Sequence, residues 1–171
     1  MRRTILLVAG GILALTACGG SDAISTGDLD KERDAADDVA RKAVAALVTD
    51  LDAAPPSPDS LGRGLYAGCD GGDPDQASYF IDTFVTYDGR PADEAAAEAE
   101  KALDDAGLPA QVDAATNTLS VEKAGVSIDL SSQEKGGGSA GQNIFVSTGC
   151  LAVGKNAIAA FNAENGRPVR P

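Results

Sequence analysis

The sequence predicts an α+β domain in which an antiparallel sheet of about five strands carries two helices on one face and is closed by one disulfide. Three observations support this prediction. Residues 29–51 and 92–106 repeat apolar side chains at the three- and four-residue spacing of a helix. Residues 78–87 and several later segments are instead rich in β-branched or aromatic residues, or alternate apolar with polar ones. Finally, Cys69 and Cys150 bracket the strand-rich part of the chain.

The N-terminal residues have the pattern of a bacterial signal peptide. Arg2 and Arg3 precede an uncharged apolar run over residues 5–15. A run of about eleven residues is too short to cross a hydrocarbon core of about 30 Å as a helix, but it suits the apolar region of a signal. Two alternatives are export by the twin-arginine route and an ordinary secretory signal that is followed by a cysteine only by coincidence. The general secretory route is favoured because the arginine pair directly follows Met1, without further flanking residues.

The end of this segment resembles the lipobox of bacterial lipoproteins, in the residues Leu15, Thr16, Ala17 and Cys18. The resemblance implies that residues 1–17 are removed and that the Cys18 thiol carries a diacylglyceryl group, with further acylation such as palmitate on the new amino group. Two or three chains would anchor the protein stably, because each buried methylene contributes about 0.8 kcal/mol. The chain also resembles small actinobacterial secreted lipoproteins of unknown function. This resemblance implies a lipid-anchored location on the extracytoplasmic face of the cell membrane.

The net charge limits the partners that the protein can have. The formal charge of the chain is −12, and the loss of Arg2 and Arg3 with the signal would make it −14. So acidic a surface repels nucleic acid and anionic lipid headgroups. We therefore expect no nucleic-acid partner, and we expect the membrane to be met through the lipid on Cys18.

The first part of the mature chain is predicted to contain a tether, a helix and a stiff connector. Residues 18–28 are small and polar, which predicts a flexible tether. A helix is predicted over residues 29–52, and the prolines of residues 53–60 end it. This connector permits two arrangements, in which the helix packs on the domain or acts as a stalk. A glycine-punctuated segment follows at residues 61–69.

The rest of the domain is predicted to alternate between strand and helix. Residues 78–87 carry apolar groups on both faces, which places this strand inside the sheet. A helix over residues 92–106 follows and ends at Gly107. Four short strands come next, with a mobile hairpin loop before the last one. The strands are expected at residues 111–114, 118–122, 126–131 and 143–147, and the loop at 133–141. The domain spans residues 29–153, and residues 154–171 are expected to form a short helix or a disordered tail.

Cys69 and Cys150 are expected to form a disulfide, because two lone thiols in an oxidising compartment pair readily. A redox or metal role is the alternative, although the chain has neither a C-x-x-C spacing nor any histidine. Asp70, Asp73 and Asp75 form a weak calcium candidate, since their spacing does not match an EF-hand loop. A solvated turn is the simpler interpretation of these aspartates. No cofactor and no other metal site is predicted.

No catalytic residue is assigned from the sequence. Gly137, Ser139 and Gly141 match the G-x-S-x-G pattern of a nucleophile elbow, but the elbow needs a preceding strand, a following helix and a histidine. A dyad of serine with Lys135 or Lys155 has no support from spacing. The sequence therefore predicts a lipid-anchored, extracytoplasmic binding or accessory domain of the cell envelope, with an envelope protein, peptide or glycan as partner. The alternative is a cell-wall hydrolase or transferase that uses carboxylates or serine with lysine.

Overall fold

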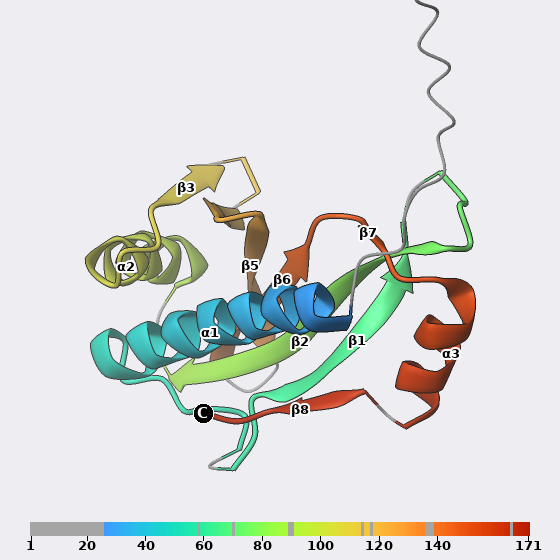
Figure 1. The fold of residues 1–171 in the computed structure, drawn as a ribbon. Coiled ribbons are helices and arrows are strands. Elements are labelled where there is room, and N and C mark those ends of the chain that lie inside the picture. Colours follow the sequence, from blue (N-terminus) through green and yellow to red (C-terminus); the bar gives the residue numbers. More distant parts are fainter. Residues whose placement is uncertain are drawn as a thin grey trace, which may run out of the picture.

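The computed structural model describes residues 26–57, 59–69, 71–88, 91–113, 115–116, 118–135, 139–164 and 166–171. In these ranges the chain forms three helices and an antiparallel sheet of eight strands (Figure 1). The helices are α1 (Thr26–Asp50), α2 (Ala92–Asp105) and α3 (Lys155–Ala163). The strands are β1 (Gly62–Gly68), β2 (Gln76–Asp88), β3 (Ala110–Asp113), β4 (Thr118–Lys123), β5 (Val126–Lys135), β6 (Ser139–Thr148), β7 (Leu151–Ala152) and β8 (Arg167–Val169). The α+β class is confirmed, but the sheet is larger than the predicted five strands.

The long strand β2 lies inside the sheet, as its sequence predicts. The strands follow the order β3-β4-β5-β6-β2-β1-β8, and β7 also pairs with β2. All neighbouring strands are antiparallel. On β2, the side chains from Tyr79 to Tyr87 in steps of two are buried, because they face the helices.

Three strands were not predicted, and each has a physical reason. β1 contains three glycines, which lower intrinsic strand propensity. Gly64 is nevertheless required, since a Cβ atom at this position would lie 1.7 Å from the hydroxyl oxygen of Tyr79. β7 and β8 have only two and three residues, too few for a periodic pattern. For residues 154–171 the expected short helix is present as α3, whereas the alternative of a disordered tail is wrong for β8, which pairs with β1 and buries Val169 completely.

The predicted hairpin loop over residues 133–141 is also wrong in extent. β5 runs to Lys135 and β6 begins at Ser139, so only residues 136–138, which lie outside the described residues, separate the two strands. Glycine suits the strand at Gly141, because a Cβ atom there would lie 2.2 Å from the Phe84 ring. Ser139 therefore begins a strand, which agrees with the rejection of a nucleophile elbow.

The helices lie on one side of the sheet. α1 crosses β2, β6 and β5 and also contacts α2, and Figure 1 shows it lying in front of the strands. The expectation that two helices share one face is confirmed, and the stalk arrangement is contradicted. The third helix, α3, covers the β1 side, where the Phe161 ring contacts the rings of Tyr66 and Tyr79. None of the helices in the described ranges has both the length and the apolar character needed to cross a membrane.

The predicted disulfide between Cys69 and Cys150 is confirmed. Cys69 follows β1 directly, and Cys150 lies between β6 and β7, with the two Cα atoms 6.0 Å apart. The bridge closes a segment of 81 residues that contains β2, α2 and the strands β3 to β6. It therefore restricts the unfolded chain over nearly half of its length.

We expect the double variant C69S/C150S to have a lower free energy of unfolding by about 4 kcal/mol, because a long closed loop loses much entropy in the unfolded chain. Urea denaturation followed by circular dichroism measures this difference. Wild-type protein unfolded with reductant present is the matched control and should show the same loss. An unchanged denaturation midpoint in the double variant would contradict the stabilising role of the bridge.

Candidate functional site

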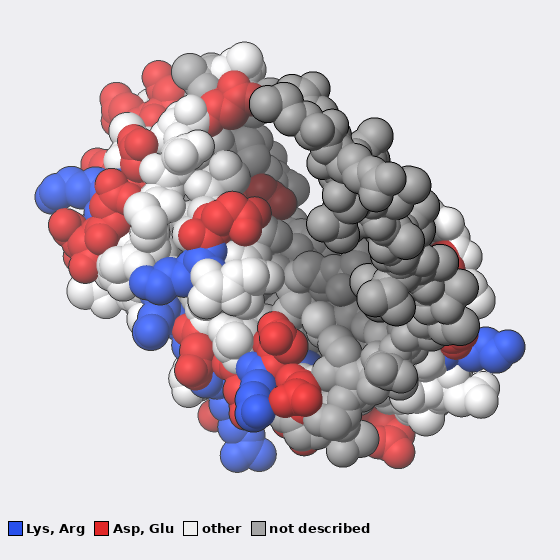
Figure 2. All heavy atoms as spheres, turned by 45° about the horizontal axis from the view of Figure 1, so that its top comes forward, with Lys and Arg blue, Asp and Glu red and all other residues white. Residues whose placement is uncertain are grey.

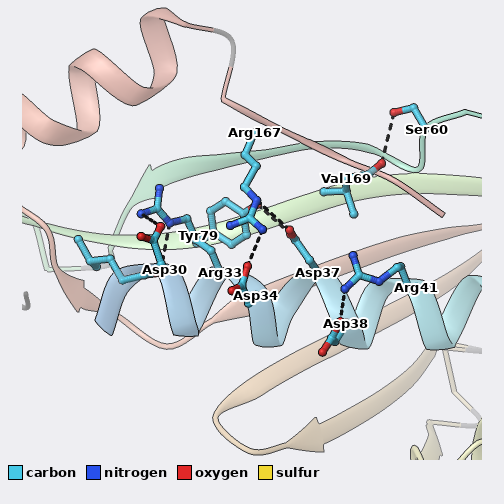
Figure 3. Close-up of polar contacts among 11 residues, drawn as sticks. Asp30, Arg33, Asp34, Asp37, Asp38, Arg41, Ser60, Tyr79, Arg167 and Val169 are labelled. Atoms are coloured by element: carbon cyan, nitrogen blue, oxygen red, sulfur yellow. Dashed lines mark hydrogen bonds and ion pairs between the residues drawn. The ribbon is translucent and has the colours of Figure 1, made fainter. Parts of the chain in front are cut away.

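A buried carboxylate lies where α1, β2 and β8 meet. Asp37 on α1 is only 2% exposed. Its Oδ1 atom accepts a hydrogen bond of 2.9 Å from the Tyr79 hydroxyl, and its Oδ2 atom lies 3.2 Å from Nε of Arg167. Arg167 also pairs with Asp34, one turn earlier on α1 (Figure 3). These contacts connect the first helix to the interior strand and to the last strand.

The surroundings set the ionisation of this cluster. Burial raises the pKa of the Asp37 carboxyl above its ordinary value, while the hydrogen bond from Tyr79 and the charge of Arg167 act in the opposite direction. Burial also raises the pKa of the Tyr79 hydroxyl, and the adjacent Asp37 carboxylate raises it further. Tyr79 therefore stays protonated and acts as a hydrogen-bond donor. Tyr79 has no exposed surface, so its hydroxyl contributes to the packing of β2 against α1.

The same side of the molecule protects the edge of β1. The side-chain amide of Asn162, on α3, accepts from the backbone N–H of Tyr66 at 3.0 Å and donates to its carbonyl at 2.8 Å. The amide thus imitates a neighbouring strand. Arg33 of α1 completes this layer with its guanidinium 5.0 Å from the centre of the Phe161 ring. An added strand would have to displace α3 here, so this edge is a poor docking site.

Two of the calcium candidates accept hydrogen bonds from the backbone, one within their own loop and one from the start of α3. Asp73 Oδ1 accepts from the backbone N–H of Asp75 at 3.0 Å, and Asp75 Oδ1 accepts from the N–H of Lys155 at the start of α3 at 3.0 Å. Asp70 and the lipidation candidate Cys18 lie outside the described residues. Across the described ranges no three candidate metal ligands come together. Asp75 therefore has a structural role at the beginning of α3.

Carboxylates gather in one hollow between the end of α1 and α2. Its volume is about 320 Å³, and Asp50, Glu98, Lys101 and Asp105 line it. All four side chains are exposed. Figure 2 shows that Asp and Glu side chains are spread over this view of the molecule, with Lys and Arg between them. The hollow is therefore one part of a generally acidic surface.

We call the side of the sheet opposite the helices the open face, and several large apolar side chains gather on it. Three phenylalanines and one leucine lie on it. They are Leu65, Phe80, Phe84 and Phe145. The Phe80 and Phe145 rings are stacked, with their centres 5.5 Å apart and their planes at 25°. Phe145 is 36% exposed and is one of only two large exposed apolar side chains in the described residues. The described helices all pack on the other side.

A second hollow adjoins the open face, next to Phe84. Its volume is about 420 Å³. The walls of this hollow come from the connector between α1 and β1 (residues 53–60), the start of β1, β2 and β6. The lining residues are Pro56, Ser57, Ser60, Leu61, Gly62, Asp82, Thr83, Phe84 and Asn143. Asp82 is the single charged residue among them.

The sequence did not predict either the Asp37 cluster or the open face. One signal for the cluster was present, since Asp37 falls in the apolar stripe of α1, three residues before Ala40 and seven before Val44. The signal for the open face was the pair Phe80 and Phe84 on the second side of residues 78–87. No protein family, curated protein or solved structure matches this chain.

We expect the variant R167M to unfold with about 2 kcal/mol less free energy at neutral pH, because it leaves the buried Asp37 charge without its cation. The raised pKa of Asp37 also sets the pH dependence. A carboxyl whose pKa is higher in the folded than in the unfolded protein stabilises the fold below its unfolded pKa, and this contribution is lost as the pH rises through the folded pKa. The deficit of R167M should therefore shrink as the pH falls toward the ordinary value of 3.8.

The control for this experiment is R41M. Arg41 pairs with Asp38, whose side chain is 60% exposed, so its loss should reduce stability by less than about 1 kcal/mol. Adding D37N to R167M should cost less than the sum of the two single losses, since both remove the same interaction. Urea denaturation at neutral and acidic pH measures the wild-type protein and the four variants R167M, R41M, D37N and D37N/R167M. Equal effects of R167M and R41M at both pH values would contradict a buried ion pair.

Proposed function

We propose that the protein is a lipid-anchored, extracytoplasmic binding domain of the cell envelope that contacts a partner through the open face of its sheet. The observation that carries the proposal is the asymmetry of the sheet. One face carries all three described helices and the core, whereas the other presents the stacked rings of Phe80 and Phe145. Apolar rings gathered on a surface between polar residues are typical of interaction sites.

The proposed anchor would hold the domain close to the membrane. Cys18 precedes Thr26, the first residue of α1, by eight positions. Eight residues span at most about 29 Å when fully extended, at about 3.6 Å per residue. A partner that meets this domain would therefore lie at or near the outer surface of the membrane. This supports an accessory role beside another envelope protein.

A cell-wall hydrolase or transferase is the weaker proposal. A glycosidase needs a general acid in a desolvated site and a second carboxylate at a set distance across the substrate. The hollow lined by Asp50, Glu98 and Asp105 offers carboxylates, but all three side chains are exposed. Lys155 and Lys101 are also exposed. A binding function requires none of these groups to have an altered ionisation.

The anchor is tested with C18S expressed in an actinobacterial host. We expect the wild-type protein to be found in the membrane fraction, with a mass equal to the chain from Cys18 plus its acyl groups. The C18S variant should leave the membrane fraction or remain uncleaved, because it lacks the thiol that receives the diacylglyceryl group. Intact mass spectrometry and fractionation measure both properties. An unlipidated wild-type protein would contradict the proposed anchor.

The binding surface is tested by photo-cross-linking in native membranes. A benzophenone amino acid at position 145 should give a discrete cross-linked product, because Phe145 is the most exposed of the four apolar residues on the open face. The same amino acid at Glu94, which is exposed on α2, is the matched control. We expect no such product from that position. Identical products from both positions, or none from position 145, would reject the open face as the binding surface.

A further inference from the structure

We propose that the open face binds a basic, apolar peptide segment of its partner, with Phe145 as the apolar contact and Asp82 and Asp129 as the two anionic contacts. This inference rests on the proposed function, because it names the chemistry of the partner at the same surface. The three residues come from three adjacent strands, β2, β6 and β5.

Strand register places the three side chains in one row. Asp82 lies directly opposite Phe145 in the pairing of β2 with β6, and Asp129 lies directly opposite Phe145 in the pairing of β5 with β6. Directly opposed residues have Cβ atoms about 4.5–5.5 Å apart. One exposed carboxylate therefore lies on each side of the Phe145 ring. A cation above this ring would be close to both carboxylates.

The carboxylates of Asp82 and Asp129 form no ion pair with another described residue. Arg63 on β1 lies one position beyond the pair Gly64 and Ile81, so the register places it beside Asp82 on this side of the sheet, but the two side chains form no ion pair. The carboxylates of α1 differ in this respect, since Asp30, Asp34 and Asp38 each pair with an arginine. The open face therefore has negative charge that a partner can neutralise.

The stacked rings and the adjoining hollow suit a long basic side chain. Lysine and arginine can lay their apolar stems along an aromatic surface while the charged group remains near water and carboxylates. The Phe80 and Phe145 rings provide such a surface. Asp82 lies between the stacked rings and the hollow, because it flanks Phe145 and also lines the hollow beside Phe84. A side chain that crosses the rings would enter the hollow at its single charged residue.

The overall charge favours the same partner. The chain carries a formal charge of −12, so its long-range field attracts basic partners and repels acidic ones. A neutral glycan gains nothing from this field, although its hydroxyls can donate hydrogen bonds to the carboxylates. Lysines or arginines placed between apolar residues satisfy both the rings and the charges. The geometry thus favours a basic segment over a glycan at this surface.

The test uses the lipidated chain in nanodiscs of zwitterionic lipid, with empty nanodiscs as the blank. The probe is a fluorescein-labelled peptide of nine residues in which lysine alternates with phenylalanine or leucine. One comparison peptide has glutamate in place of lysine, and another has serine in place of the apolar residues. Fluorescence anisotropy measures binding. We expect saturable binding only for the peptide that carries both lysine and apolar residues. Binding should weaken as salt is added.

Variants decide whether this binding is at the open face. D82N/D129N and F145S should each weaken it by about tenfold, because each removes one of the two kinds of contact. The matched control is D50N/D105N, which removes the same charge from the hollow beside α2 and should change affinity by less than about twofold. Circular dichroism confirms that each variant is folded. If F145S does not fold, D82N/D129N against D50N/D105N decides the result alone.

Four outcomes would overturn the proposal. Equal weakening by D82N/D129N and D50N/D105N would mean non-specific charge attraction. Equal binding of the glutamate peptide, or no saturable binding of the lysine peptide, would mean that basic chemistry is not recognised. Binding of a neutral cell-wall oligosaccharide that D82N/D129N does not affect, without peptide binding, would make the open face a glycan site. A cross-link from position 145 that persists in any of these cases would leave the binding function intact.

Discussion

The packing of α1 against β2, β6 and β5 is the contact on which the rest of the structure depends. Small side chains make this contact close, since Ala36, Ala40 and Ala43 are completely buried between the helix and the sheet. The stripe is interrupted by Asp37, whose burial is unfavourable unless the carboxylate is hydrogen-bonded and paired. Tyr79 and Arg167 meet that requirement from two different strands. The first helix thereby holds the last strand of the sheet in place.

This requirement explains the arrangement at the β1 edge. Arg167 can reach Asp37 only if β8 pairs beside β1, and β1 approaches the Tyr79 ring closely because residue 64 is glycine. α3 then fills the remaining side of β1, with Asn162 bonded to the backbone of Tyr66. The described part of this edge is closed by β8 and α3. A partner is therefore more easily accommodated on the face of the sheet than at this edge.

The placement of all three described helices on one side has a further consequence. The core lies between these helices and the sheet, and the open face contributes little to it. Some polar groups remain buried on the helix side, including Gln142, whose amide has no hydrogen-bond partner in the described residues. On the other side, Phe80 and Phe145 instead stack on each other in contact with solvent. The proposed partner contact would therefore be made at a surface and not in an enclosed pocket.

Local patterns in the sequence determined the parts of the structure that depend on neighbouring residues. The apolar stripes of residues 29–51 and 92–106 identify α1 and α2, because a helix repeats every 3.6 residues whatever it packs against. The aromatic and β-branched residues of 78–87 identify β2 in the same way. The pairing of Cys69 with Cys150 followed from counting cysteines. These features need no knowledge of the distant chain.

Only the tertiary structure decided the rest. β1, β7 and β8 are strands because β2 and β1 offer them backbone groups to pair with, not because of their own residues. The partners of Asp37 are 42 residues away at Tyr79 and still farther at Arg167, so no local pattern connects them. Alternation along β2 and β6 showed two different faces but not which one the helices cover. That choice depends on where α1 packs, and it alone leaves Phe145, Asp82 and Asp129 exposed together.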